Sequence, residues 1–241
     1  MKAVREFDRF AASYAKTNII QRQVAEYLVS WIEEREYPRI LDLGCGSGEV
    51  YRRLRAKGIG FDEFWGVDLS EEMLRKHPKD RRIHCRLGDF SDASLLDELA
   101  SQTWDLLLSS SALQWSSDLD RTLSGLSRIG APAYFALFTS GTFRTLHRTA
   151  GLDSPILDFP HTFEALRRHY RPRKAERVKY RLHFDSTREI FAYIKKSGVS
   201  GGEARLSYRQ TKRLMREYPV DYLEFELLFF SGSPKTAFSR S

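Results

Sequence analysis

The sequence has few cysteines, no long apolar run and no apolar segment in its opening stretch, and each absence argues against a class of protein. Cys45 and Cys85 are the two cysteines in 241 residues, which is too few for a disulfide scaffold, and no metal-ligand spacing surrounds them. No apolar run approaches the roughly 18–20 residues that span a bilayer. The opening stretch, MKAVREFDRF, lacks the apolar core of a signal peptide. We therefore expect a soluble cytoplasmic protein with no metal site and no membrane segment.

The length and the hydrophobic pattern indicate one α/β domain. Hydrophobic residues make up 41% of the chain, enough for a substantial core. After two predicted helices at 4–15 and 19–36, apolar strand patterns alternate with helical ones, which predicts a parallel sheet with helices on both faces. The expected strands are 39–43, 62–68, 82–88, 104–109, 132–138, 173–184 and 221–232. The expected helices between them are 48–57, 71–76, 93–100, 118–129, 142–150, 161–168, 186–196 and 207–217.

A glycine-rich turn follows the first predicted strand, in ILDLGCGSGEV at 40–50. Glycines at such a turn allow positive φ and a close approach of the backbone to a ligand. A dinucleotide fingerprint reads G-x-G-x-x-G, whereas here Gly44, Gly46 and Gly48 give G-x-G-x-G after Asp42. This form resembles motif I of the class I methyltransferases, which bind S-adenosylmethionine (SAM). The resemblance implies that Cys45, within the turn, also contacts SAM.

The next strands end in residues suited to the same ligand. Asp68 can accept both hydroxyls of a ribose, with Leu69 beside it. By the methyltransferase resemblance, Asp89 meets the adenine amino group and Phe90 lies against the ring. Ser109 opens the loop after the fourth strand, the next wall of the cleft. Ordinary turn chemistry is the alternative interpretation of these residues.

Further segments narrow the resemblance. They are FDRFAASYAKTNIIQRQVAEYL (7–28), SSSALQWSSDL (109–119), SGTFRTLH (140–147), DFPHTFEAL (158–166), AYIKKSGVSGG (192–202) and RQTKRLMREYPVDYLEFELLFFSG (209–232). In this order they resemble the BioC family of malonyl-acyl-carrier-protein O-methyltransferases. SRIGAP (127–132) departs from the Arg-Pro-Gly-Gly turn usual in that family.

The resemblance implies a Rossmann-like class I methyltransferase fold, with a mostly parallel seven-stranded sheet whose last strand is antiparallel. We expect one SAM-dependent methyltransferase domain over 1–241, with N-terminal helices at 1–36 and a small helical lid within about 140–217. The implied reaction converts the free carboxylate of malonyl-acyl carrier protein to its methyl ester, an early step of biotin (pimeloyl) synthesis. S-adenosyl-L-homocysteine is the implied second product.

The implied chemistry needs orientation more than proton transfer, because a malonyl carboxylate is already ionised at neutral pH. Tyr14 and His147 are the candidate catalytic residues, and Gln21 is a candidate contact for the methionine end of SAM. For each of the three, a structural or solvated role is the alternative. The candidate substrate contacts are Leu113, Gln114, Trp115 and Arg144.

A basic stretch at 167–181 holds eight Lys or Arg residues and one Glu, in a chain with a net charge of +7. Most of these cations fall at odd positions, as on the outer face of a half-buried strand. The stretch suits an acidic partner, and acyl carrier protein bearing malonyl-phosphopantetheine is the one that the resemblance implies. Its predicted docking residues are Arg167, Arg168, Arg171, Arg173 and Lys174. A merely solvated face is the alternative interpretation, and we expect the protein to be a monomer.

Three other functions remain open at this level. A methyltransferase for a small free acid, like the trans-aconitate methyltransferases, would share the glycine loop without needing a basic docking face. An RNA methyltransferase would fit the basic charge, but no Asn-Pro-Pro-Tyr-type motif is present, so we expect no nucleic-acid partner. A non-catalytic module that kept the fold is the third, and the intact glycine loop argues against it.

Overall fold

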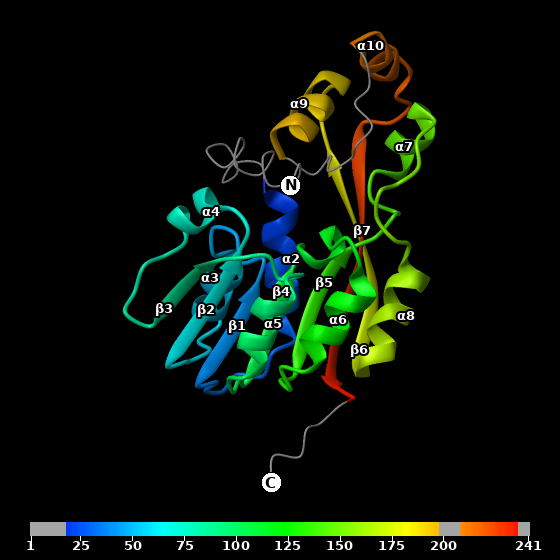
Figure 1. Ribbon diagram of the computed structural model, residues 1–241. Coiled ribbons are helices and arrows are strands. Elements are labelled where there is room, and N and C mark those ends of the chain that lie inside the picture. Colours follow the sequence, from blue (N-terminus) through cyan, green and yellow to red (C-terminus); the bar gives the residue numbers. More distant parts are fainter. Residues whose placement is uncertain (1–17, 198–207, 236–241) are drawn as a thin grey trace.

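The computed structural model describes residues 18–197 and 208–235, and the strands in these ranges form a seven-stranded sheet (Figure 1). Its strand order is β3-β2-β1-β4-β5-β7-β6. The strands are β1 (Arg39–Leu43), β2 (Glu63–Asp68), β3 (Ile83–Leu87), β4 (Leu106–Ser110), β5 (Ala133–Phe138), β6 (Tyr170–His183) and β7 (Tyr222–Pro234). β7 runs antiparallel to both of its neighbours, β5 and β6, and the other pairings are parallel. The predicted fold class is confirmed, including the antiparallel last strand.

The helices lie at the ranges expected, within a few residues for most of them. They are α2 (Ile19–Ser30), α3 (Glu49–Ala56), α4 (Glu71–Lys76), α5 (Ala93–Ala100), the 3₁₀ turn η1 (Leu113–Trp115), α6 (Leu119–Ser127), α7 (Arg144–Ala150), α8 (Phe159–His169), α9 (Thr187–Ser197) and α10 (Tyr208–Glu217). α2 ends six residues before the predicted limit of 36. The predicted helix 4–15, which includes Tyr14, lies outside the described residues. In the ranges that the structure covers, every helix is too short or too polar to cross a bilayer.

Two apolar cores lie on the two faces of the sheet. One face packs against α2 and α3, through buried residues such as Val24, Leu28 and Leu54. The other packs against α5, α6 and α8, through residues such as Leu96 and Leu123. Both faces of β1, β4 and β5 are therefore covered, which explains why these strands are continuous apolar runs in the sequence.

The register of the sheet fixes which ends of the strands lie together. Because β6 and β5 are both antiparallel to β7, they run in the same direction. Pro172 of β6 lies level with Ala133 at the start of β5, since both pair with Gly232, and Val178 lies level with Phe138 at its end, since both pair with Leu227. Residues 179–183 and 222–226 therefore continue past the end of β5. We call this paired segment the β6–β7 extension; α7, α9 and α10 surround it (Figure 1).

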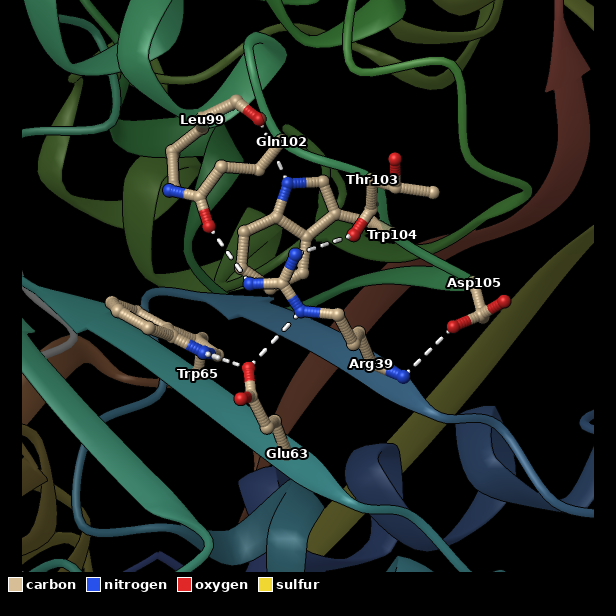
Figure 2. A network of polar contacts seen from close by, with 8 residues as sticks. All are labelled: Arg39, Glu63, Trp65, Leu99, Gln102, Thr103, Trp104 and Asp105. Atoms are coloured by element: carbon tan, nitrogen blue, oxygen red, sulfur yellow. Dashed lines mark hydrogen bonds and ion pairs between the residues drawn. The ribbon is translucent and has the colours of Figure 1, made fainter.

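The opposite edge, where the parallel strands begin, is closed by a polar network around Arg39 (Figure 2). Its guanidinium donates to Glu63, to the carbonyl of Thr103 and to the side chain of Gln102, at 2.8–3.1 Å. The guanidinium also lies 4.6 Å from the ring centroid of Trp104, within cation–π range. The network joins β1, β2 and the chain before β4, so this edge of the sheet is used for structure.

Candidate functional site

A cavity of about 320 Å³ opens at the edge where β1, β2, β3 and β4 end. Open α/β sheets bind ligands at this edge, because the loops that follow the strands converge there. The residues that line the cavity are Asn18, Gln21, Ala25, Gly44, Cys45, Gly46, Ser47, Glu49, Val50, Asp68, Leu69, Ser70, Met73, Asp89, Phe90, Ser91, Ser110, Ser111, Ala112, Trp115 and Ser117. The cavity therefore brings together segments that lie up to a hundred residues apart in the chain.

The glycine loop forms the floor of the cavity, and its backbone needs glycine. Gly44 and Gly46 line the cavity with φ of 69° and 53°. A Cβ on Gly44 would lie 2.1 Å from the Cβ of Ala112, so this glycine lets the loops after β1 and β4 touch. Gly48 has φ of 87° and precedes the first residue of α3, where it does not line the cavity. Two of the three predicted glycines thus reach the cavity, and the third starts the helix.

Asp68, at the end of β2, holds the glycine loop in place. Its Oδ2 accepts the backbone N–H of Gly46 at 2.8 Å, and its Oδ1 accepts that of Ser70 at 2.9 Å. A carboxylate offers about four acceptor positions, so one side chain can accept several hydrogen bonds at once. Asp68 lines the cavity, as the sequence predicts, and it can accept hydrogen bonds there from a vicinal diol.

Asp42 was predicted to contact the cofactor, but it does not line the cavity. Its side chain is fully buried. Within the described part of the chain, neither carboxylate oxygen accepts a hydrogen bond. Burial, and secondarily the nearby charge of Asp68, holds the pKa of Asp42 well above its ordinary value. Asp42 lies in the wall behind the glycine loop because it belongs to β1 itself, where the sheet is covered on both faces.

The remaining predicted residues of the first three loops line the cavity. Cys45 is buried on its wall, and burial raises the pKa of the thiol, which keeps it protonated. Asp89 is exposed on the rim, where its Oδ1 accepts the N–H of Ser91 at 2.7 Å. Phe90 and Leu69 supply the apolar surface beside it, and Leu69 leaves 42% of its surface exposed. An acid flanked by two apolar side chains suits a flat heteroaromatic ring with a polar edge.

The loop after β4 corrects two predictions. Ser109 is fully buried and its hydroxyl donates to the carbonyl of Leu43 at 2.8 Å, so it ties β4 to β1 and does not reach the cavity. Successive residues of a strand point to opposite sides, which is why Ser110 lines the cavity in its place. Leu113 is fully buried in the core under α5 and α6, and therefore cannot contact a substrate in this conformation.

Trp115 faces the cavity, whereas its neighbour Gln114 does not line it. Gln114 instead folds back, and its Nε2 donates to the carbonyl of Ser111 at 2.8 Å. The tight 3₁₀ turn of η1 points successive residues in different directions. Of the three residues predicted to contact a substrate in this turn, only Trp115 is on the wall of the cavity.

His147 and Arg144 lie on α7, away from the wall of the described cavity. The ring of His147 is half-buried, and its Nδ1 has no hydrogen-bond partner among the described residues. Burial lowers the pKa of His147, while the charge of Glu224 opposes this, so the imidazole is neutral at pH 7. Arg144 is exposed. The helix is held by β7: Glu224 accepts the N–H of Thr145.

The predicted docking cations do not form one surface near the cavity. Arg171 and Arg173 lie at the start of β6, level with the start of β5, which is the edge opposite the cavity. Arg168 is paired with Asp120 of α6, and Arg167 with Glu164 of its own helix. Lys174 lies on the α2 face, 3.8 Å from the ring centroid of Trp31. The strand direction thus carries 167–174 to the edge opposite the cavity, and their role in docking stays a prediction.

The structure adds cavity residues that the sequence did not single out. Ser111 lines the cavity with a φ of 62°, rare for a residue with a side chain. Its Oγ and the Oε1 of Gln21 are buried polar atoms on the wall without hydrogen-bond partners in the described part of the chain. On the wall of a cavity, such atoms are available as hydrogen-bond partners for a ligand. Gln21 was predicted, but no feature of the sequence distinguishes Ser111 from the serines around it.

The charge of the cavity discriminates between ligands. Its charged lining residues, among those described, are Glu49, Asp68 and Asp89, and none is Lys, Arg or His. Glu49 is bridged to Arg53 at 2.7 Å, so Asp68 and Asp89 dominate the charge that a ligand meets. A pyrophosphate would be repelled, whereas a ligand with positive groups is stabilised. The glycine loop here is therefore better matched to a cationic nucleoside than to a dinucleotide.

Comparisons with known proteins agree with this geometry. Residues 41–137 match a family described as a methyltransferase domain. A malonyl-[acyl-carrier protein] O-methyltransferase from Halorhodospira halophila is 35% identical over 160 residues, which are 64% of this chain and 52% of that protein. A protein of the same name from Chlorobium phaeovibrioides is 28% identical over 224 residues, 88% and 85% of the two chains. The chain thus spans about half the length of the first relative and most of the second.

Solved structures share the fold. A chain from the Haloferax volcanii complex of the Trm112 methyltransferase activator with a methyltransferase has a TM-score of 0.64 at 19% identity, covering 97% of this chain and 98% of that chain. A Haemonchus contortus phosphoethanolamine N-methyltransferase, solved with S-adenosylmethionine, has a TM-score of 0.58 at 16% identity, covering 97% and 60%. The sheet described above therefore has the fold of these solved structures.

Proposed function

We propose that this chain, which carries a methyltransferase domain at residues 41–137 and is similar over much of its length to malonyl-[acyl-carrier protein] O-methyltransferases, is a SAM-dependent carboxyl O-methyltransferase. Its proposed substrate is the free carboxylate of a malonyl thioester on acyl carrier protein, and its product is the methyl ester. The ester would enter the synthesis of the pimeloyl part of biotin. The whole chain, 1–241, would act as one domain, with α7 to α10 as the substrate-side lid.

The observation that carries the proposal is an acidic cavity built on a G-x-G-x-G loop. SAM carries a sulfonium and an ammonium group, and a cavity whose described lining residues include acids and no basic side chain favours positive groups. The ribose hydroxyls fit Asp68, and the adenine fits the rim formed by Leu69, Asp89 and Phe90. The buried Oε1 of Gln21 suits the ammonium group, because it lacks a donor in the described part of the chain.

When bound, SAM supplies a methyl group made electrophilic by the attached sulfonium. Transfer of that methyl group to a carboxylate oxygen would release neutral S-adenosylhomocysteine and would require no proton transfer. The protein therefore needs no general base, and its residues must align the two reactants and exclude water. Trp115 and the apolar rim would exclude water. A neutral His147 would serve as a hydrogen-bond donor toward the substrate and not as a strong charge that stabilises the nucleophile.

Tyr14 remains a proposed orienting residue for the carboxylate, and it lies outside the described residues. Arg144, exposed on α7, remains a proposed contact for the substrate. Both proposals depend on the substrate approaching from the side of α2 and α7. They are secondary to the assignment of the SAM cavity.

Mass spectrometry of malonyl-acyl carrier protein, incubated with the enzyme and SAM, tests the proposal directly. The expected result is a gain of one methyl group on the carrier protein, with release of S-adenosylhomocysteine. The same incubation with trans-aconitate tests the small-acid alternative. Methylation of free aconitate without any change in the carrier protein would overturn the proposed substrate. Failure to bind SAM in calorimetry would overturn the enzyme assignment itself.

A further inference from the structure

We propose that the cationic surface of α7 and α10 is the docking surface for an acidic carrier protein. We call it the basic ridge: Arg144 and Arg148 of α7 and Arg209, Lys212, Arg213 and Arg216 of α10. All six side chains are exposed. The inference rests on the proposed function, since it identifies where the protein that bears the thioester binds.

The cations of α10 share one helix face. Arg209, Lys212, Arg213 and Arg216 are spaced i, i+3, i+4 and i+7, which places them on one side of a helix. Leu214 is buried, and it anchors the helix to the protein. Glu217 is the acidic residue of α10, and it is shared by Arg213 at 2.9 Å and Arg216 at 3.8 Å. The three arginines of this face outnumber Glu217, so the face is positive.

α7 extends the same surface. Arg144 and Arg148 are one turn apart, and α7 contains no acidic residue. α7 contacts both α10 and β7. Glu224 accepts the backbone N–H of Thr145, which ties α7 to β7. The ridge therefore lies on two helices that contact each other, one of which also contacts β7.

The ridge lies at the edge of the sheet where the cavity opens. α7 and α10 flank the β6–β7 extension, past the end of β5 (Figure 1). A thioester carried on a flexible prosthetic arm must enter from that edge. Arg167 and Arg171 lie toward the opposite edge, where a docked carrier could not present its arm to the cavity.

An acidic protein fits the ridge better than RNA. The ridge is confined to two short helices, whereas RNA that followed it onto the cavity rim would bring its phosphates beside Asp68 and Asp89. Arginine forks at separated positions pair individually with carboxylates, which suits an acidic helix. The two relatives reported above are themselves named for action on an acyl-carrier protein.

Charge reversal tests the ridge. Arg209→Glu combined with Arg216→Glu is compared with a matched control at the other edge, Arg167→Glu combined with Arg171→Glu. The substrates are malonyl-acyl carrier protein and malonyl-pantetheine, which has the same reacting group without the protein. We expect the ridge variant to raise KM for the protein substrate by about tenfold or more at low ionic strength, and to change kcat/KM for malonyl-pantetheine by less than about twofold.

Direct binding separates this proposal from the proposed function. Calorimetry of the holo-carrier protein against wild type and both variants needs no methyl transfer. Binding lost in the ridge variant and kept in the control supports the ridge even if malonyl is not the substrate. The proposal is overturned by equal losses in both variants, by equal losses on both thioesters, or by a ridge that binds RNA and not the carrier protein. Unchanged circular dichroism and SAM affinity verify that the ridge variant is folded.

Discussion

The carboxylate of Asp68 accepts the backbone N–H of Gly46 at 2.8 Å, across 22 residues of sequence. This bond fixes the glycine loop after β1 to the end of β2, and the same carboxylate faces the cavity. One side chain therefore both shapes the loop and offers acceptors to a ligand. The two roles predict that its loss affects binding more than folding.

Asp68→Asn should weaken SAM binding by roughly tenfold to a hundredfold, since hydrogen bonds to a charged group contribute about 1.5–3 kcal/mol. Calorimetry measures the affinity, and urea unfolding measures the accompanying change in stability. Glu63→Gln is the matched control, because it removes a charge from the other end of β2, in the Arg39 network. Equal SAM affinity in wild type and Asp68→Asn would disprove the ribose assignment.

Gly44→Ala should both destabilise the protein and close part of the cavity. Its positive φ costs about 1–2 kcal/mol for a residue with a Cβ, and the contact with Ala112 adds about 1–3 kcal/mol of overpacking. Gly58→Ala is the control, because Gly58 has φ of 80° and nothing within 4 Å of its Cβ position. Urea unfolding should show the larger loss at Gly44. Similar losses at the two positions would mean that the contact between the two loops has no energetic weight.

Asp42→Asn should raise stability at neutral pH. The folded state holds the pKa of Asp42 above its unfolded value, so the folded protein retains a proton that the unfolded chain has released. Stability is therefore lost as pH rises from the unfolded pKa of about 3.9 through the raised folded pKa. Thermal unfolding of Asp42→Asn against wild type should show the largest gain above that window and none below it. Asp62→Asn, an exposed carboxylate before β2, controls for loss of one charge; an equal gain there would contradict the assignment.

Trp115→Ala and Leu113→Ala should separate binding from stability, although they lie two residues apart. Trp115 lines the cavity, so its loss should reduce SAM affinity about tenfold, equivalent to about 1.4 kcal/mol. Leu113 is fully buried in the core, so its truncation should cost about 2–5 kcal/mol of unfolding free energy. Calorimetry and urea unfolding on both variants check this. If Trp115→Ala had normal SAM affinity and reduced stability, Trp115 would have a structural role and not a role in binding.

The sequence alone predicted most of the fold and part of the site. The apolar strands and the helices between them are local patterns, and the glycine loop, Asp68 and Asp89 each lie in a short local motif at the end of a strand. Gly44, Cys45, Gly46, Asp68, Leu69, Asp89 and Phe90 all line the cavity as expected. The sequence sufficed to predict these residues, because the carboxyl ends of the strands in a parallel sheet lie at one edge whatever the details of packing.

Tertiary structure decided what depends on direction and burial. The pattern of strand β4 did not show which of Ser109, Ser110 and Ser111 faces the cavity, because that choice depends on the pairing of β4 with β1 and β5. The 3₁₀ turn sent Leu113 into the core and Trp115 to the cavity. The predicted docking residues at 167–174 lie at the edge opposite the cavity because β6 runs parallel to β5, a relation set by the antiparallel strand β7 between them. Local sequence therefore determined the helices, the strands and the residue types of the loops. Which side chains come together at the cavity depends on side-chain direction and strand direction, and these are properties of the assembled sheet.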